Sequence, residues 1–568
     1  MRNSAAAMNQ SARENGWEFM SREVVIFARA SSADTVDASS LSAAGGLVRR
    51  SGRIAFPVCG DGTNLVILRG VDINAPHTSP VNVATVSTCA WRHWLLPSLT
   101  QLLWLTLLLV LLAQPWRTTM VASDGDACMH WRVGETMLQS RQIIRADIFS
   151  HTRAGAPIVS KEWLSELVFA VAGRLGGLYG VAAVGALVIA AAFALLHRQL
   201  LREGNDALVA TSIVLLAAWA SSAHWLARPH AFSFLMIVLW HGALRKFMRT
   251  EKVGTLLITL GVLTVFWVNL HGAYLAGFFV LGVYWVSAAI EKDHRKFGVL
   301  TVAALSCAAL SLLNPNGYKL LFYNVQFLYS DFFKNWLAEY ASMRFGSIEA
   351  LGFILWLGMM FLTLALRRPR LTVSEGLVLI SWTYFALYSA RNVPLLAILS
   401  APILVPAISE AATARWQMPS QKMRMLNEAA RGWVVSTILA VMIVAVPQLT
   451  VMPSKDWPTG AVAFIKTHDQ QFDGNMFNQY AWGGYLMQYL PKHKVFVDGR
   501  ADFYGENLLR EFSDTTALHT NWTQVLQKYD VRWTLMPTDH RLNLALALLP
   551  GWHCAYSDEV AMVYSRQE

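Results

Sequence analysis

The chain has 568 residues, of which 54% are hydrophobic and only 15% are charged. Soluble domains carry about 25% charged residues, so this composition excludes an ordinary soluble protein and indicates one that is embedded in lipid. The formal net charge of +10 does not indicate a nucleic-acid-binding protein, because the basic residues stand in short loops between apolar runs, which is how membrane topology is encoded.

Residues 1–90 are rich in Ser, Ala and Gly and contain no apolar run long enough for a signal sequence or a membrane span. Within them, the β-branched residues of 54–73 flank a Gly-Asp-Gly turn and could form a hairpin. The simpler interpretation is that 1–90 is a poorly ordered leader, and no function is assigned to it.

From residue 91 to 450 the chain predicts an α-helical polytopic membrane domain. About eleven apolar runs of roughly 16 to 22 residues follow one another, near the length that a bilayer requires. Their centres lie near Leu105, Leu187, Leu215, Leu239, Gly261, Gly282, Ala304, Met359, Ile380, Leu399 and Ala440.

The basic residues predict the orientation of these spans. If the first span runs outward, one set of short loops holds sixteen Lys and Arg residues, whereas the opposite short loops hold only Arg228 and Arg391. The basic set is therefore expected in the cytoplasm, in a multi-pass membrane protein. Segments 114–176, 314–348 and 451–568 are then outside.

The last segment, 451–568, has a different composition and is long enough for a small domain. Strands are expected over 494–497, 531–536 and 560–564, and helices over 507–512 and 521–529. This alternation predicts a compact C-terminal α/β extracytoplasmic domain.

The first outer segment contains SDGDACMHW, residues 123–131, which sets two carboxylates and an imidazole beside the membrane. Its S-x-x-D spacing fits a capping box in which Asp126 caps a helix, and on that helix Asp126 and His130 share one face. Asp124 has no such structural role. The choice of a functional carboxylate therefore stays open between Asp124 and Asp126.

Further polar residues stand in the segments that are expected outside. Such groups at span ends are costly unless they face a cavity or one another. Two of them have simpler explanations: an Arg at a span end can extend its charged group to the lipid head groups, and Asn-Pro-Asn-Gly can form a turn that ends a helix. Glu162 could simply cap a surface helix over 163–175. Because all of these residues are expected on the same side of the membrane, they nevertheless favour a single functional site on its outer face. The candidates are Asp147, Glu162, Arg228, His230, Asn269, His271, Lys319, Glu339 and Arg391.

Several phrases resemble a poorly characterised bacterial membrane-protein group within the GT-C superfamily of membrane glycosyltransferases. They are DGDACMHWRVGE, RADIFSHTRAG, KEWLSEL, ARPH, WVNLHGAY, LLNPNGYKLL, ARNVPLL and NQYAWGGYLMQYLPKHKVFVDGRADFYG. The resemblance covers about residues 94–566. Members of the superfamily, such as protein mannosyltransferases and oligosaccharyltransferases, take sugar from a polyprenyl-phosphate or polyprenyl-diphosphate carrier.

The resemblance implies a catalytic acidic residue in the first outer loop, carried over here to Asp124 or Asp126. Metal-dependent oligosaccharyltransferases have a second acidic motif in a later outer loop, whereas the link ARPH has no carboxylate and Glu339 is the only stand-in. We therefore assign no cofactor with certainty: a divalent metal is possible but is not favoured.

The expected reaction is transfer of a sugar from a polyprenyl-phosphate carrier to an acceptor protein, lipid or glycan, with the Asp as general base and inversion at the sugar. Arg228 and Arg391, with Lys319 behind them, suit the phosphate that leaves. His230, His271 and Asn269 suit sugar hydroxyls or phosphate, and no nucleic-acid partner is expected.

In the C-terminal segment, WGGY (482–485) stands where the oligosaccharyltransferase WWDYGY motif would, without its tryptophan pair and aspartate. Trp482, Tyr485, Asp498 and Arg500 are the candidates for acceptor contact. The alternative for the last two is an internal ion pair that fixes a turn.

Two other functions compete with a glycosyltransferase. A transporter or flippase would carry lipid-linked or small polar substrates, and a non-catalytic scaffold of the same fold would bind a partner through its outer lobe. Transporters tend to place ionisable residues near the membrane midplane, often within repeated halves. Here the polar residues stand at span ends and no repeat is visible, which favours the enzyme.

Overall fold

The computed structural model describes residues 54–58, 64–68, 85–86, 96–123, 125–337, 340–415, 427, 432–445, 452–453 and 455–566. Of the leader, only three short strands are described: β1 (Ile54–Val58), β2 (Asn64–Leu68) and β3 (Thr85–Val86). β1 and β2 pair antiparallel as the hairpin that the turn residues allow, and the rest of the expected leader lies outside the described residues. Residues 97–429 and 433–568 form one compact unit.

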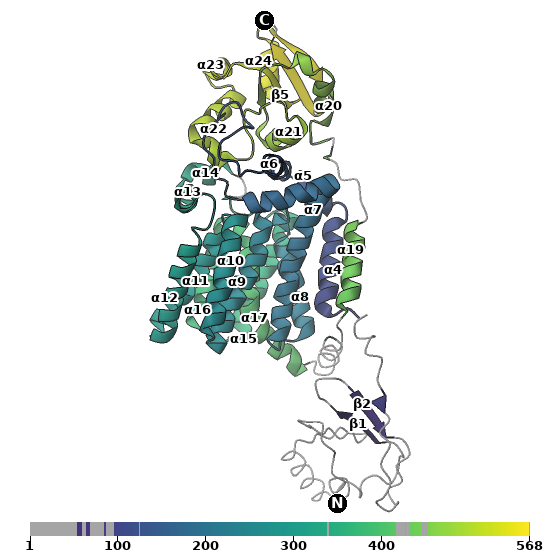
Figure 1. Cartoon of the computed structure of the whole chain (residues 1–568), viewed down its shortest axis with the longest axis vertical. Coiled ribbons are helices and arrows are strands. Elements are labelled where there is room, and N and C mark those ends of the chain that lie inside the picture. The colour runs from purple at the N-terminus through teal and green to yellow at the C-terminus, as the bar shows by residue number, and fades with distance from the viewer. Residues whose placement is uncertain are drawn as a thin grey trace, which may run out of the picture. The chain divides into compact units, whose positions relative to one another are not determined.

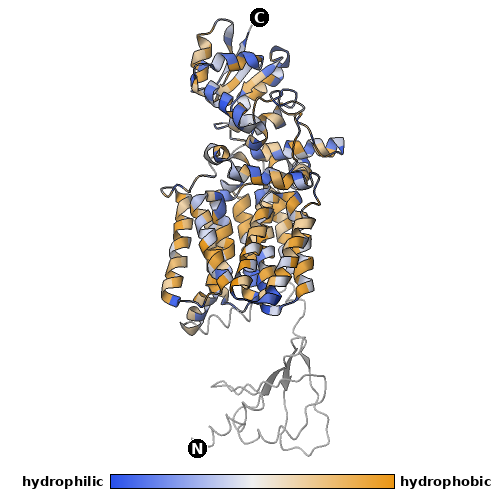
Figure 2. Cartoon of the chain, turned by 90° about the vertical axis from the view of Figure 1, so that its left-hand side faces the viewer, coloured by the Kyte–Doolittle hydropathy of each residue, from blue (hydrophilic) through white to orange (hydrophobic). Residues whose placement is uncertain are grey.

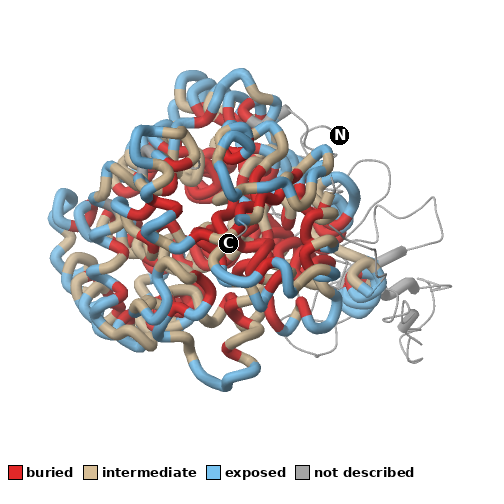
Figure 3. The backbone as a smooth tube through the Cα atoms, turned by 90° about the horizontal axis from the view of Figure 1, so that it is seen from above, coloured by how far each residue is buried: buried red, intermediate tan, exposed pale blue. Residues whose placement is uncertain are grey.

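A bundle of apolar helices forms the larger part of this unit (Figures 1 and 2). Its helices are α4 (Leu99–Leu112), α7 (Trp163–Arg202), α8 (Ala207–Ala220), α9 (His230–Thr250), α10 (Val253–Leu270), α11 (Tyr274–Ile290), α12 (His294–Leu310), α15 (Ile348–Arg367), α16 (Val373–Tyr388), α17 (Val393–Arg415) and α19 (Trp433–Ala445). Each predicted span centre falls within one of them. Figure 3 shows that the buried backbone lies toward the middle of the unit.

Not every helix of the bundle is long enough to cross a membrane by itself. By length and apolarity five described helices qualify, or six if α4 and α5 (Trp116–Ala122), which are bent by 66° at a short break, are one span. Other apolar helices, such as α8 and α11, are shorter. The polytopic membrane fold is confirmed, whereas the number of eleven spans stays a prediction.

Helix α7 contains the predicted surface helix. Its backbone leaves helical geometry at Gly176 and Gly177, and Gly177 has φ 57° and ψ −143°, a conformation that only glycine adopts readily. Residues 163–175 therefore form a separate first arm, and the span begins after the break.

Helix α6 (Asp126–Ser140) packs directly on this first arm of α7. A Cβ atom at Gly134 would lie 2.0 Å from the backbone oxygen of Glu166, so the two backbones approach as closely as a glycine allows. The predicted capping box is wrong: Gly125 is the N-cap and makes no side-chain cap bond, and Asp126 is the first helical residue. The Asp126 side chain is therefore available for other contacts.

The C-terminal lobe contains a four-stranded sheet in the order β4 (Asn475–Asn478), β5 (Val531–Pro537), β7 (Ala561–Arg566), β6 (Trp552–Ser557). β4 and β5 are parallel and the other pairs are antiparallel. The remaining outer helices are α13 (Tyr318–Tyr329), α14 (Asp331–Trp336), α20 (Thr459–Thr467), α21 (Gly483–Tyr489), α22 (Ala501–Ala517), α23 (Trp522–Lys528) and α24 (Arg541–Ala547). The predicted strands 531–536 and 560–564 and both predicted helices are confirmed.

The strand predicted over 494–497 is wrong. Val495 makes only an isolated bridge to Ser150 of the first outer loop, and its N–H donates to the carbonyl of Phe149 at 3.0 Å. Val495, Phe496 and Val497 are fully buried. Their apolar pattern therefore reflects burial at the junction between the lobe and the first outer loop, not a place in the sheet.

Candidate functional site

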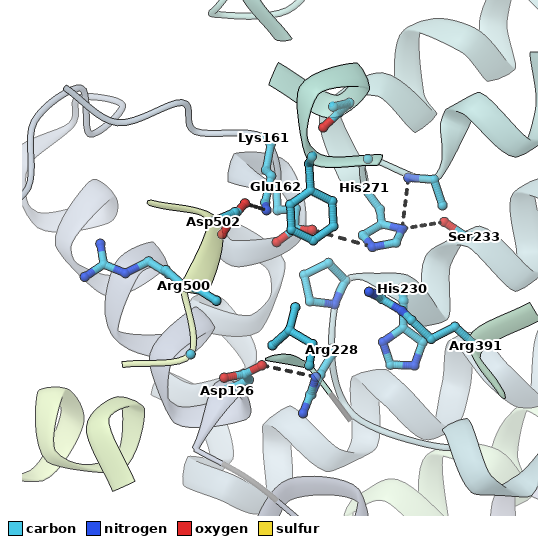
Figure 4. Close-up of a pocket in the computed structure, with 18 of the residues that line it drawn as sticks. Asp126, Lys161, Glu162, Arg228, His230, Ser233, His271, Arg391, Arg500 and Asp502 are labelled. Carbon is cyan, nitrogen blue, oxygen red and sulfur yellow. Dashed lines mark hydrogen bonds and ion pairs between the residues drawn. The ribbon is translucent and has the colours of Figure 1, made fainter. Parts of the chain in front are cut away.

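A cavity of about 1270 Å³ lies where the first outer loop, the outer ends of the spans and the lobe meet. Its walls come from α6, the start of α7, the 223–234 link, the 271–279 link, the 388–395 link and residues 499–503 of the lobe. The ionisable side chains on these walls are Asp126, His130, Arg153, Lys161, Glu162, Glu166, His224, Arg228, His230, His271, Arg391, Arg500 and Asp502. Figure 4 shows that Asp126 faces Arg228, Lys161 faces Asp502 and Glu162 faces His271.

Asp126 and Arg228 form an ion pair on one side of this cavity. An Nη1 atom of Arg228 lies 3.1 Å from Oδ2 of Asp126, and both side chains are largely buried (Figure 4). On the other side of the carboxylate, a Cβ atom at Gly499 of the lobe would lie 1.8 Å from Asp126 Oδ1. The lobe therefore lies directly against the carboxylate, and a larger residue at position 499 would push the Asp126 side chain aside.

The other predicted cation, Arg391, also lines the cavity. It lies in the short 3₁₀ turn Ala390–Asn392 between α16 and α17. Its guanidinium stands 4.6 Å from the ring centroid of Tyr340, a cation–π contact that fixes the direction of a long side chain. His230 is close by on the wall, and its Nε2–H donates to the carbonyl of His224 at 3.0 Å.

A second ion pair joins the first outer loop to the lobe across the cavity. The ammonium of Lys161 contacts the carboxylate of Asp502 and also faces the rings of Tyr323 and Phe327 on α13. Although burial favours the neutral acid, the charge of Lys161 lowers the pKa of Asp502. Neither residue of this pair is among the candidates that the sequence analysis selects.

A cluster of two histidines and two glutamates lies on the wall beside α6 and α7. His130 Nδ1 is 3.2 Å from Glu166 Oε1, and His271 Nε2 is 3.5 Å from Glu162 Oε1. Burial raises the pKa of Glu162. Burial disfavours a charged imidazole at His130, yet the hydrogen bond to Glu166 and the nearby carboxylates raise its pKa.

Glu162 does not cap the helix that it precedes. It occupies the N-cap position of α7 but makes no side-chain cap bond, and it lines the cavity instead. Glu166 was missed by the sequence analysis, although KEWLSEL places it four residues after Glu162 and hence on the same helix face. This spacing was the signal that could have identified it.

Other candidates have structural roles or lie elsewhere. The Asn269 side chain accepts a hydrogen bond from Trp163 Nε1 at 2.7 Å and donates to two backbone carbonyls, so it is committed to packing and does not line the cavity. Lys319 is exposed on α13 and is not on the cavity wall. Asp124 and Glu339 lie outside the described residues.

Of the four candidates for acceptor contact, only Arg500 lines the cavity. Asp498 is fully buried and pairs with Arg500 at 2.5 Å, as the alternative interpretation of an internal ion pair expects. Trp482 and Tyr485 are buried within the lobe, where the Trp482 indole donates to the Asp456 carbonyl. The structure does not bring Asp498, Trp482 and Tyr485 to the cavity.

Asp147 of the first outer loop belongs to the same buried network. Arg500 Nη1 lies 2.9 Å from Asp147 Oδ1, and the side chains of Asp147 and Asp498 are fully buried. Tyr504 donates its hydroxyl to Asp498 at 2.6 Å. One guanidinium therefore pairs with two buried carboxylates and ties the lobe to the loop.

The glycine pair of WGGY allows the lobe to dock. A Cβ atom at Gly484 would lie 2.2 Å from the carbonyl oxygen of Gly125, which is backbone and cannot move aside as a side chain can.

We expect Gly484→Ala to lower the free energy of unfolding by about 1–3 kcal/mol, measured by denaturant titration of the purified chain. Gly376→Ala is the control, because nothing lies within 4 Å of its new methyl group. Equal stability of the two variants would contradict this account of the junction.

No protein-family model and no curated protein matches the sequence. Among solved structures, the archaeal oligosaccharyltransferase AglB from Archaeoglobus fulgidus, in complex with an inhibitory peptide and a dolichol-phosphate, is similar over 83% of this chain and 74% of its own, with 13% identity and a TM-score of 0.53. The chain has a GT-C fold. A second solved structure, ArnT from Cupriavidus metallidurans bound to undecaprenyl phosphate, aligns with 82% of this chain and 96% of its own, with 15% identity and a TM-score of 0.46.

The comparison confirms the fold that the resemblance implies. At 13% identity it shows the fold and not the reaction.

Proposed function

We propose that this chain is an inverting membrane glycosyltransferase. It transfers a sugar from a polyprenyl-phosphate carrier to an acceptor on the outer face of a bacterial inner membrane, with Asp126 as the general base. The C-terminal lobe is then extracytoplasmic. The neighbour that shares its fold, AglB, was solved with a dolichol-phosphate, which agrees with a polyprenyl-linked donor.

The observation that carries this proposal is the shared cavity of Asp126, Arg228 and Arg391. These residues are far apart in the sequence and come from three different outer connections. A carboxylate that can accept a proton and guanidinium groups that can bind phosphate oxygens are the two chemical groups that such a transfer requires.

In the proposed reaction, a carboxylate oxygen of Asp126 accepts the proton of the acceptor hydroxyl or amide. The acceptor atom then forms a bond to the anomeric carbon as the bond from that carbon to the phosphate oxygen breaks. The polyprenyl phosphate leaves with the bonding electron pair, and the configuration at the anomeric carbon inverts. Arg228 orients the base, because its guanidinium already holds Asp126.

Arg391 and Lys161 are the proposed partners of the leaving phosphate. Both line the cavity, and Arg391 binds a phosphate in bidentate geometry better than a lysine does. Lys161 carries an ammonium that is held in place by Asp502. His230 lies on the same wall and is proposed to contact sugar hydroxyls or phosphate oxygens. His271 lies there too, but both of its ring nitrogens already have protein partners.

The lipid carrier has an entrance between α11 and α16. Phe279 of α11 and Tyr384 and Tyr388 of α16 line the cavity, and their side chains are exposed. Exposed aromatic side chains at the end of membrane helices are compatible with lipid contact. A polyprenyl chain can therefore stay in the bilayer while its phosphate reaches the polar wall.

We expect Arg391→Ala to raise the apparent KM for the donor about 10-fold to 100-fold, because a charge-assisted hydrogen bond contributes about 1.5–3 kcal/mol. The measurement is the initial rate of sugar transfer at varied donor concentration in membranes with equal amounts of each variant. Arg295→Ala is the control, since Arg295 is exposed and pairs with Glu251 away from the cavity. An unchanged donor KM in Arg391→Ala would remove Arg391 from the phosphate site.

Transfer of a radiolabelled sugar from a polyprenyl-phosphate carrier to membrane acceptors separates an enzyme from the two competing functions. A transporter or a scaffold would leave the label on the carrier. Label that appears in the acceptor only when the chain is present supports the enzyme, and label that stays on the carrier contradicts it.

A further inference from the structure

Three side chains that ligate metals converge on the wall formed by α6 and α7. One ligand atom each from His130, Glu162 and Glu166 lies within 4.8 Å of the other two, and all three residues line the cavity. Ligand atoms at about 2.1 Å from a tetrahedral Zn²⁺ lie about 3.4 Å apart. The cluster therefore needs only small side-chain rotations to match the spacing of a metal site.

The packing of the two helices produces this convergence. Glu162 and Glu166 are four residues apart at the start of α7 and share a face. Gly134, four residues after His130, lets α6 touch the backbone of α7 at Glu166, so His130 is held against the same face. The three ligands thus come from the rigid ends of two helices rather than from loops.

The local charges favour a cation in this position. Lys161 is paired with Asp502, and Arg228 is paired with Asp126. The ion pairs that the structure gives to Glu162 and Glu166 are both with imidazoles. Two neighbouring carboxylates that are largely buried are costly to keep charged together, and a divalent cation between them would lower that cost.

A hydrogen-bond chain behind the cluster orients one of the carboxylates. Trp267 Nε1–H donates to Ser233 Oγ at 2.8 Å, so the Ser233 hydroxyl is free to donate to His271 Nδ1 at 2.9 Å. The N–H of Ala273 also donates to His271 Nδ1. These two donors place the imidazole proton on Nε2, which faces Glu162 at 3.5 Å. Such outer partners commonly hold metal ligands in position.

We propose that His130, Glu162 and Glu166 form a site for one divalent transition-metal ion, with His271 as a positioning residue for Glu162. An imidazole with two carboxylates suits Zn²⁺ or Mn²⁺, whereas Mg²⁺ and Ca²⁺ prefer oxygen ligands alone. The ion would add positive charge to the wall that faces the proposed phosphate site. The sequence does not favour a metal because the later link ARPH has no carboxylate, whereas this donor set lies within the first outer segment.

The test is metal binding, which does not depend on the proposed transfer reaction. The full-length chain is purified in detergent, stripped with a chelator and dialysed against Zn²⁺, Mn²⁺ or Mg²⁺, and the metal per chain is measured by mass spectrometry. We expect one Zn²⁺ or Mn²⁺ per chain and no retained Mg²⁺. Co²⁺ in the same site should give the visible absorption of a nitrogen- and oxygen-ligated ion.

The variants locate the ion. Glu162→Gln with Glu166→Gln should abolish stoichiometric binding, and His130→Gln alone should remove the Co²⁺ absorption. His271→Ala should weaken the affinity about 10-fold to 100-fold without abolishing the stoichiometry. The matched control is Glu135→Gln, because this residue of α6 pairs with the exposed Arg174 and does not line the cavity.

Wild-type protein that retains no metal after dialysis would overturn the proposal, even if no variant folds. Metal that is retained equally by wild type, by His130→Gln and by the double variant would overturn it too. In either case sugar transfer by the wild type would still support the proposed function, so the two conclusions fail separately.

Discussion

Asp126→Asn is expected to lower kcat for sugar transfer by about 10²-fold to 10⁴-fold, which is the usual contribution of a general base. The asparagine oxygen can still accept a hydrogen bond from Arg228, so the ion-pair geometry is largely kept. An amide cannot take the acceptor proton, however. The measurement is the rate of transfer of radiolabelled sugar at saturating donor, normalised to the amount of protein in the membrane.

Glu135→Gln controls for the loss of a carboxylate from the same helix, since Glu135 is tied to Arg174 and lies off the cavity wall. Asp124→Asn tests the second candidate of the sequence analysis. Full activity of Asp126→Asn together with loss of activity in Asp124→Asn would transfer the role of base to Asp124. Full activity of both variants and of the double variant would show that the general base does not lie in this loop.

Arg500→Ala is expected to lower the free energy of unfolding by about 3–5 kcal/mol, because removal of one partner leaves buried charge uncompensated. Asp147 and Asp498 are fully buried, and Arg500 is the guanidinium that pairs with both. The measurement is denaturant-induced unfolding of the purified full chain, together with the rate at which a protease cleaves the lobe.

Arg510→Ala provides the matched control within α22. Arg510 pairs with Glu506 at the surface, where both side chains are about half exposed, and such a pair contributes at most about 1 kcal/mol. Arg500→Lys should recover part of the stability, because it restores one charge but not the forked contact. If Arg500→Ala and Arg510→Ala unfold alike, the network does not anchor the lobe.

The sequence predicts the membrane part of the fold well, because lipid requires long apolar runs. All eleven predicted centres fall within helices, and the glycine break of α7 follows directly after the predicted surface helix. Predictions in the lobe were weaker. Segment 494–497 has the apolar pattern of a strand, yet its backbone pairs with the first outer loop, and no local pattern distinguishes these two kinds of burial.

The candidate site was predicted in part. The shared outer side of Asp126, Arg228 and Arg391 follows from charge and spacing, and the structure places all three on one cavity. The pairing of Arg228 with Asp126 was not predictable, because it depends on how two distant connections approach. The same holds for Lys161 and Asp502, which are 341 positions apart.

The contact between Gly499 and Asp126 bears on how the protein matures. Gly499 lies against Asp126 and belongs to the cavity wall. It follows the membrane helices that carry Arg228 and Arg391 in the sequence, so it is synthesised after them. During synthesis the cavity therefore remains open to water until the lobe has folded and docked, and any reaction that needs an enclosed site begins only after this docking.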